Sequence, residues 1–134
     1  MKVQASYEEY SVEGISKAAK TAEEQGYEIF SASETGHNPY LPLVLAAEHT
    51  ERIQLQTSIA LSFARSPMDT AYIAWYLQNL SRGRFTLVLG SQVRGHIVRS
   101  FSMPCSAPAP SMLASVLALS PTWAFLTDGP YLSV

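Results

Sequence analysis

Apolar and polar residues follow two different periods along the chain, one typical of helices and the other typical of strands. Between Ser11 and Gly26 the apolar residues fall at helical spacing, and they are Val12, Ile15, Ala18, Ala19 and Ala22. Serine is favoured at the amino-terminal cap of a helix, and glycine is favoured just past the carboxyl terminus. The pattern therefore predicts an amphipathic helix that Ser11 caps and Gly26 ends.

Two further helices are predicted downstream. Residues 42–50 are mostly apolar, and Pro42 lies in the first turn, where a helix tolerates proline. The third helix has the strongest signals, since Ser66 can cap it, Pro67 suits its first position and Asp69 favours the positive end of its dipole. Its apolar stripe is expected to consist of Ala71, Tyr72, Trp75 and Leu80.

Strand patterns separate these helices. Residues 2–6 and 27–32 each predict a short strand, and residues 53–59 alternate strictly between the two faces of a strand. The apolar members of that alternation are Ile53, Leu55, Thr57 and Ile59. From Phe85 the chain is apolar up to Gly90, and a polar loop that contains glycine follows. This segment predicts a fully buried parallel strand.

The elements alternate regularly, because a helix lies between each strand and the next. Such an order requires parallel strands with right-handed crossovers, and it places the ligand site at the carboxyl ends of the strands. Four loops are expected to converge there: 6–10, 33–40, 58–65 and 90–110. Both a barrel segment with all helices outside and an open sheet with helices on both faces satisfy this pattern.

The composition is that of a globular protein, with 134 residues, 47% hydrophobic and 15% charged. The net charge is −2 and charged residues are scattered, which argues against nucleic acid or a membrane surface as a partner. No apolar run approaches the roughly 20 residues of a membrane span, so we expect a cytoplasmic protein. The single cysteine, Cys105, excludes an intramolecular disulfide and a multi-cysteine metal site, and no metal is predicted.

The carboxyl-terminal part has a different composition. Three prolines lie in residues 104–110, and residues 110–126 are apolar without any charge. Pro121 interrupts this segment, and an interior proline costs a helix about 3 kcal/mol, so a break is expected near Ser120. A helix that is apolar on all sides is typical of a core or an interface.

Five segments, in this order, resemble the luciferase-like monooxygenase family, and within it they are most similar to the coenzyme F420-dependent oxidoreductases. The segments are Ala22 to Tyr27, Glu34 to Leu43, Glu48 to Ile53, Ala64 to Met68, and Leu80 to His96. The resemblance extends over residues 15 to 112 and implies an α/β fold of parallel β/α units that form the first half of a (β/α)8 TIM barrel. It implies a single truncated domain over residues 1–134, in which residues 104–134 are divergent.

The same resemblance implies chemistry and partners. Family members use coenzyme F420 or, alternatively, FMN for hydride transfer or monooxygenation of a small-molecule substrate. Four open parallel units leave two sheet edges and an inner face uncovered, which favours a homo-oligomer.

The resemblance also assigns site residues. It places Glu34 beside the cofactor ring, and it makes His37 the local candidate for proton transfer, whereas a loop histidine with a structural hydrogen bond is an equally good interpretation. A bulge, often with a non-prolyl cis peptide, corresponds to Thr57, Ser58 and Ile59, and the relatives commonly have glycine where this chain has Gln56 and Ser58. The loop that contacts the cofactor after the fourth strand corresponds to Gly90, Ser91 and Gln92.

Beyond that loop the sequence departs from the family. Val93 occupies a position where some deazaflavin enzymes carry a proton-donating glutamate. Arg94, His96 and Arg99 suit an anionic tail as well as a solvated loop face. Three hypotheses remain open at this point: a flavin- or deazaflavin-dependent enzyme, a non-catalytic half-barrel stabilised by self-association, and a small open-sheet binding domain.

Overall fold

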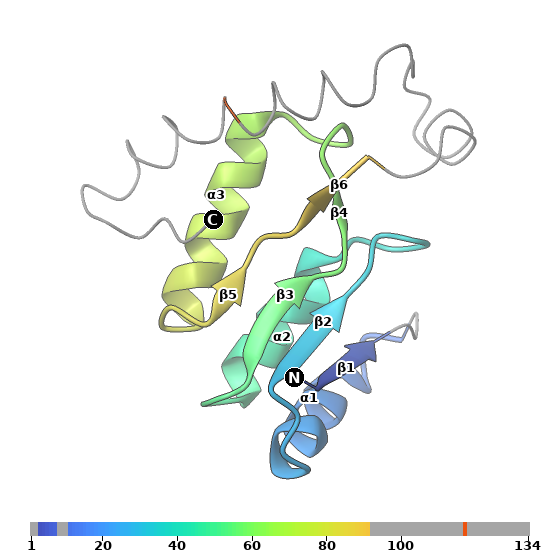
Figure 1. Cartoon of the computed structure of the whole chain (residues 1–134), viewed down its shortest axis with the longest axis vertical. Helices are drawn as coiled ribbons and strands as arrows, with labels where there is room; N and C mark the ends of the chain where they lie inside the picture. The colour runs from blue at the N-terminus through green and yellow to red at the C-terminus, as the bar shows by residue number, and fades with distance from the viewer. Residues whose placement is uncertain (1–2, 8–10, 92–116, 118–134) are drawn as a thin grey trace. The chain divides into compact units, whose positions relative to one another are not determined.

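The computed structural model describes residues 3–7, 11–91 and 117 of the chain (Figure 1). Its elements are β1 (Gln4–Tyr7), α1 (Ile15–Glu24), β2 (Ile29–Ala32), α2 (Tyr40–His49), β3 (Gln54–Thr57), β4 (Ala60–Leu61), α3 (Pro67–Leu80), β5 (Phe85–Thr86) and β6 (Leu89–Gly90). The chain divides into two compact units. One comprises Met1–Ala60 and Tyr76–Leu89, and the other comprises Leu61–Trp75 and Gly90–Val134.

The first unit is built on a four-stranded sheet in the order β1-β2-β3-β5. Every neighbouring pair is parallel, and the strands follow one another across the sheet in chain order. Figure 1 shows α1 and α2 behind this sheet, on the same face. A sequential order with both helices on one face is the arrangement of a barrel segment, whereas an open doubly wound sheet has helices on both faces. The predicted α/β fold of parallel β/α units is confirmed.

The core lies between the sheet and these two helices. Phe30 is paired with Leu55, and Leu55 is paired with Phe85, so that large apolar side chains form a row on the helix-covered face. All three are buried, and the ring of Tyr7 lies 6.1 Å from that of Phe30. The helices contribute Ile15, Ala19, Ala22, Leu43, Ala46 and Ala47. Small helical residues allow close approach to the large side chains of the strands.

The two ends of α1 differ in how well the sequence predicted them. Gly26 has φ +82° and follows the helix, with its N–H donating to the carbonyl of Glu23 and the N–H of Tyr27 donating to that of Ala22. This is the expected glycine-terminated end. The predicted Ser11 cap is wrong, because the helix begins after Gly14 and the Ser11 carbonyl accepts a hydrogen bond from the Tyr7 hydroxyl.

The start of α3 agrees with its sequence, but its apolar stripe does not. The Ser66 hydroxyl accepts the Asp69 N–H at 3.1 Å and donates to the Asp69 carboxylate at 2.8 Å, a reciprocal cap. The buried face consists of the small or slender residues Thr70, Ala71, Ala74 and Leu77. Large side chains lie on the exposed side instead, and they are Met68, Tyr72, Tyr76 and Leu80. The hydrophobic periodicity predicted the helix correctly, but the size of the residues decided which of its faces is buried.

The predicted continuous strand from Phe85 to Gly90 is also wrong. The structure has two short strands there, and only Phe85 is buried while residues 86–90 are exposed or half-buried. The register with β3 stops at Thr86. Beyond it, the side chain of Thr57 takes both backbone groups of Val88, as described below, so the sheet ladder cannot continue. Strand β3 likewise ends at Thr57, two residues before its predicted end.

A single guanidinium joins the amino-terminal ends of two strands to the end of a helix. Arg84 precedes β5 and donates five hydrogen bonds: to the carbonyls of Ser81, Ile53, Thr50 and Ala47, and to the hydroxyl of Thr50. Carbonyls at a helix carboxyl terminus lack partners within the helix and carry partial negative charge, so a cation satisfies them well. Burial lowers the pKa of the Arg84 guanidinium, with the nearby Glu23 carboxylate acting in the opposite direction.

Some predicted features lie outside the described residues. They are the loop from Gln92 onward and the apolar segment 110–126, of which only Leu117 is described, as helical and exposed. Within the described part of the chain, no helix is both long enough and apolar enough to cross a membrane.

Replacing Arg84 by Lys should lower the free energy of unfolding by about 2 kcal/mol, because an ammonium group cannot reproduce the forked contacts of a guanidinium. Urea denaturation of the 134-residue chain measures this. The exposed Arg82 in the same turn provides a matched control, and Arg82→Lys should change stability by less than about 0.5 kcal/mol. Equal effects of the two substitutions on the free energy of unfolding would show that the forked Arg84 contacts do not stabilise the fold.

Candidate functional site

The loop after β2 and the segment after β3 meet at the carboxyl edge of the sheet. The Glu34 N–H donates to the Ile59 carbonyl at 3.1 Å, and the Ser58 N–H donates to the Ala32 carbonyl at 2.8 Å. Glu34 is 3% exposed, so its carboxyl group lies inside this edge. The Ser58–Ile59 peptide bond is cis, at the place where the family resemblance puts one. Two segments predicted separately as site segments are therefore adjacent.

Thr57 links the end of β3 to the chain beyond β5. Its hydroxyl donates to the Val88 carbonyl at 2.8 Å and accepts the Val88 N–H at 2.7 Å. The Ala60 N–H donates to the same carbonyl at 2.9 Å. Thr57 is fully buried, and it faces the helix-covered side of the sheet together with Leu55. Its side chain thus serves as a structural link that fixes the position of Ser58 and Ile59.

His37 lies in the same loop as Glu34 and is half-buried. The loop ends at α2, where the Asn38 side-chain oxygen accepts the Tyr40 N–H at 2.8 Å. This interaction satisfies a free donor in the first turn of the helix. Tyr40 itself is buried, so the loop is held at its far end as well as at Glu34. Both fixed points place His37 in a short, restrained segment at the carboxyl edge of β2.

The fourth-strand loop belongs to the second unit. There the Gly90 carbonyl accepts the Ser62 N–H at 3.1 Å and the Ser62 hydroxyl at 3.4 Å. Ser91 is half-buried. Gln92, Val93 and the basic residues Arg94, His96 and Arg99 lie outside the described residues.

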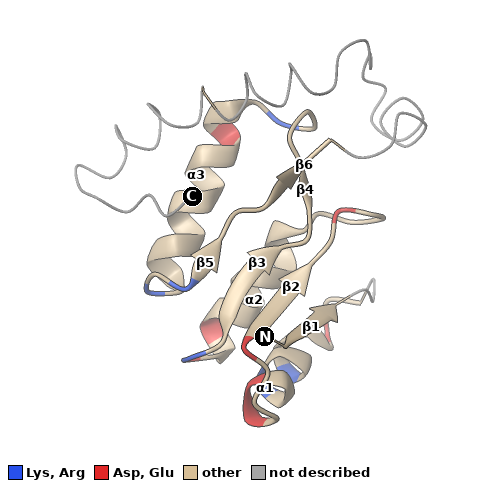
Figure 2. Cartoon of the chain, in the orientation of Figure 1, with Lys and Arg blue, Asp and Glu red and all other residues tan. Residues whose placement is uncertain are grey.

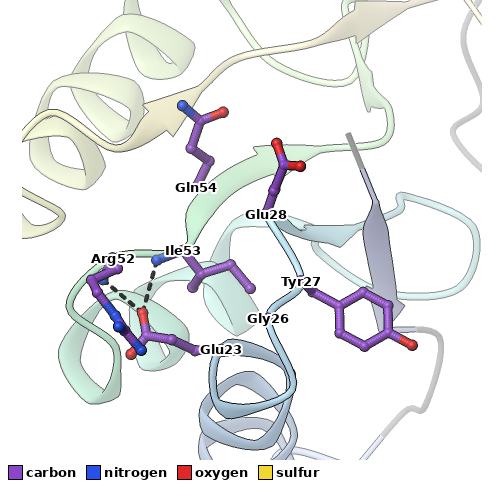
Figure 3. A pocket seen from close by; sticks show the side chains of 7 residues that line it. All are labelled: Glu23, Gly26, Tyr27, Glu28, Arg52, Ile53 and Gln54. Atoms are coloured by element: carbon purple, nitrogen blue, oxygen red, sulfur yellow. Dashed lines mark hydrogen bonds between the residues drawn. The ribbon is translucent and has the colours of Figure 1, made fainter. Parts of the chain in front are cut away.

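A shallow hollow of about 370 Å³ lies at the opposite end of the sheet, near the amino ends of β2 and β3. Figure 3 shows its lining, which consists of Glu23, Gly26, Tyr27, Glu28, Arg52, Ile53 and Gln54. The Glu23 carboxylate accepts three consecutive backbone N–H groups, from Glu51 at 3.1 Å, Arg52 at 2.6 Å and Ile53 at 2.8 Å. The principal acidic group of the hollow is therefore engaged in holding the turn before β3. A structural role for Glu23 explains this hollow better than ligand binding does.

The pKa of the Glu23 carboxyl follows from these contacts. Burial raises the pKa. The hydrogen bonds from Ile53, Arg52 and Glu51 and the positive charge of Arg52 together lower it by more, so the pKa lies below its ordinary value of 4.5. Folding therefore favours the ionised form.

No group of three or more His, Cys, Asp or Glu side chains is placed to hold a metal ion among residues 3–7, 11–91 and 117. The chemistry of the carboxyl edge is that of hydrogen bonding by hydroxyls, amides, a carboxyl group and one imidazole.

Several structurally decisive contacts were missed from the sequence. They involve Thr57 with Val88, Ser62 with Gly90, Glu23 with the turn at residues 51–53, and Arg84 with the end of α2. Each joins residues about thirty positions apart, a separation that local periodicity does not encode. The only local signal was Thr57, a polar residue on the otherwise apolar face of the alternating 53–59 pattern.

Comparison with known proteins identifies the family. The family model described as "Luciferase-like monooxygenase" matches residues 2–131, which is nearly the whole chain. The chain belongs to the luciferase-like monooxygenase family. Family membership agrees with the predicted resemblance.

Relatives and solved structures show how much of a family member this chain spans. An uncharacterized protein of Mycobacterium tuberculosis is 47% identical over 112 residues, which are 84% of this chain and 33% of the relative. The chain thus spans about a third of that relative's length.

Two solved structures share the fold. A coenzyme F420-dependent tetrahydromethanopterin reductase from Methanopyrus kandleri has a TM-score of 0.78 at 21% identity, and it covers 100% of this chain and 42% of its own. The oxygenating constituent of 3,6-diketocamphane monooxygenase from Pseudomonas putida, solved with FMN, has a TM-score of 0.82 at 17% identity, covering 92% of this chain and 40% of its own. At such identities the likeness shows the fold.

Replacing Thr57 by Val should lower the free energy of unfolding by about 2 kcal/mol, because the isosteric side chain leaves the Val88 N–H without its acceptor. Hydrogen exchange of the Val88 amide should accelerate as well. Thr57→Ser keeps the hydroxyl and should restore the slow exchange. Unchanged Val88 exchange in the valine variant would contradict the proposed link.

The free energy of unfolding should depend on the ionisation of Glu23. Because its folded-state pKa is below its unfolded value, the contribution is complete above pH 4.5 and is lost as the pH falls through the folded pKa. Glu23→Gln should therefore cost about 1 kcal/mol at neutral pH, a low value because the group is solvated, and the deficit should shrink in acid. Urea denaturation across this pH range measures both effects.

The neighbouring Glu24, exposed on α1, provides the control for that experiment. Glu24→Gln should leave the pH profile unchanged. A constant deficit of the Glu23 variant at every pH would show that its charge plays no part.

Proposed function

We propose that this chain binds a flavin or deazaflavin ring at the carboxyl edge of β2 and β3 and acts as an oxidoreductase on a small molecule. Coenzyme F420 is the cofactor that we favour, with FMN as the alternative, and the reaction is hydride transfer or monooxygenation. The observation that carries the proposal is the hydrogen bond from the Glu34 N–H to the Ile59 carbonyl, which brings two family-assigned cofactor segments together. Membership of the luciferase-like monooxygenase family supports it independently.

The residues at this edge fit such a ring chemically. A flavin or deazaflavin presents uncharged N–H donors and carbonyl acceptors along one side of a planar system, and these pair with hydroxyl, amide, carboxyl and backbone groups. In the proposal, Glu34 with Thr57, Ser58 and Ile59 forms one wall of the site. The family resemblance also assigns Gly90, Ser91 and Gln92 to cofactor binding. When bound, the reduced ring supplies the hydride or the electrons that activate oxygen.

Within this proposal the protein has three tasks: binding, orientation and proton transfer. The restrained loop between Glu34 and Asn38 orients His37, whose imidazole is able to hold or release a proton. Thr57 keeps the segment behind the ring in place through Val88. A substrate proton would then be exchanged at the His37 ring.

A second candidate is a non-catalytic half-barrel that associates with a copy of itself, with residues 1–134 acting as one domain. It is favoured by the position of β1 and β5 at the two ends of the described four-stranded sheet, because edge strands can pair with another chain. Such a protein would be folded and oligomeric without any affinity for the cofactors.

The test is a fluorescence titration of the purified 134-residue chain with FMN and, separately, with coenzyme F420, together with its mass in solution. We expect a dissociation constant in the micromolar range or below for one of the two. Glu34→Ala should weaken binding about tenfold, which corresponds to one lost hydrogen bond to a charged group. Glu48→Ala, on the exposed surface of α2, is the matched control and should leave affinity unchanged.

A folded chain that binds neither cofactor would refute the enzymatic proposal, and a dimeric mass in that case would favour the second candidate.

A further inference from the structure

The helix-free face of the four-stranded sheet carries a row of uncharged polar side chains, Ser6, Ser31, Gln56 and Thr86, which we call the polar row. The strand register aligns these four residues across β1, β2, β3 and β5. Side chains alternate between the faces of a strand, and the residues opposite the polar row, such as Phe30 and Leu55, face the helices. Each member is therefore the last residue of its strand on this face before the carboxyl edge.

A directed chain of hydrogen bonds joins two members of the polar row, Gln56 and Ser31, through Gln4. The Gln56 side-chain N–H donates to the Gln4 amide oxygen at 3.3 Å, and the Gln4 side-chain N–H donates to the Ser31 hydroxyl at 2.6 Å. The Ser31 hydroxyl donates in turn to the Ala5 carbonyl at 3.5 Å, and Ser31 is fully buried. The Gln4 side chain thus contacts Ser31 and Gln56 at the same time. It orients the Gln56 amide so that the Gln56 nitrogen points toward Gln4.

The orientation of Gln56 has a chemical consequence. With the amide nitrogen engaged by Gln4, the Gln56 carbonyl oxygen Oε1 remains as a preoriented acceptor on the helix-free face. Gln56 is half-buried and is followed directly by Thr57 and the Ser58 segment at the carboxyl edge. An acceptor in that place suits an N–H donor of a ligand bound at the edge.

The polarity of this face is unusual for its position. The interior of a parallel β/α barrel is normally filled by branched apolar side chains. Here the row contains only hydroxyls and amides, and Figure 2 shows the four strands free of Lys, Arg, Asp and Glu. An ordered polar network without charge selects for uncharged hydrogen-bonding groups, because a bound charge would meet no counter-ion on these strands.

We propose that Gln56 is a ligand-binding residue whose Oε1 accepts the ring N–H of an uncharged planar heterocycle, and that Gln4 and Ser31 are the positioning residues that orient it. The inference rests on the proposed flavin or deazaflavin site and deepens it by assigning a contact to the ring edge. It gives Gln56, where relatives commonly carry glycine, a direct role in recognition.

The test combines a protein variant with a modified ligand. The full 134-residue chain is titrated with FMN and with FMN methylated at its ring N–H, or with the corresponding two forms of coenzyme F420 if that is the cofactor it binds, and the experiment is repeated with Gln56→Leu. For the wild type, methylation should weaken binding about tenfold, since the methyl group removes the donor and leaves the acceptor unpaired. Gln56→Leu should lose about tenfold for FMN and should discriminate less than about twofold between the two ligands, as a double-mutant cycle requires.

The matched control is Gln54→Leu, which changes the same residue type on the same strand and face, two positions nearer the amino end. It should bind FMN within about twofold of the wild type and retain the discrimination against the methylated ring. Gln4→Leu should reduce that discrimination without abolishing it, because Gln56 loses its orienting partner but keeps its oxygen. Circular dichroism and thermal unfolding establish that each variant is folded.

Each outcome decides the inference. If the wild type binds FMN and its methylated form equally well, the inference is overturned while the cofactor-binding proposal stands. This comparison uses only the wild-type chain, so it does not depend on whether a variant folds. Equal affinity of Gln56→Leu and wild type for FMN overturns it in the same way. If the folded wild type binds neither FMN nor coenzyme F420, the proposed function fails and the inference fails with it.

Discussion

The first unit depends most on the guanidinium of Arg84. Its five hydrogen bonds join the carboxyl end of α2, the residue before β3 and the turn after α3, so the two crossovers through α2 and α3 are fixed around one cation. Parallel strands cannot be joined by tight hairpins, so their crossovers are long, and the Arg84 contacts hold the ends of two of these crossovers together. Glu23 acts in a complementary way, because its carboxylate accepts the backbone N–H groups that precede β3. Carbonyls and N–H groups that secondary structure leaves without partners are thereby satisfied by one cation and one anion.

These charged ties lie at the amino ends of β3 and β5, whereas hydroxyl and backbone groups join the segments at the carboxyl edge. Thr57 holds Val88 through a hydroxyl, and Glu34 is anchored there through its backbone N–H. Gln4, Ser31 and Gln56 form their network through amides and a hydroxyl. In β/α folds the amino end serves stability and the carboxyl end serves the ligand. The positions of Arg84 and Glu23 at the amino ends follow that division.

The helices and the order of strands were predictable because their signals are local. Gly26 ends α1, Ser66 and Asp69 start α3, and the alternation around Leu55 marks β3. The site could be predicted only in part. The family resemblance identified Glu34 and the segment from Thr57 to Ile59, which the structure brings together, but nothing in the sequence pointed to Val88 or to the polar network between Gln4 and Gln56.

The sequence by itself determined the parallel β/α architecture and the family, since periodicity, capping residues and ordered segments are written in neighbouring positions. Only the tertiary structure decided which side of α3 is buried, where β5 stops, and how the two loops meet at Ile59. Small residues such as Ala71 and Ala74 form the buried face of α3 because they allow close packing. Tyr72 has a larger apolar area, but it lies on the exposed face. The end of β5 is set by the Thr57 hydroxyl, a group that is distant in sequence and that competes directly with the sheet for the backbone of Val88.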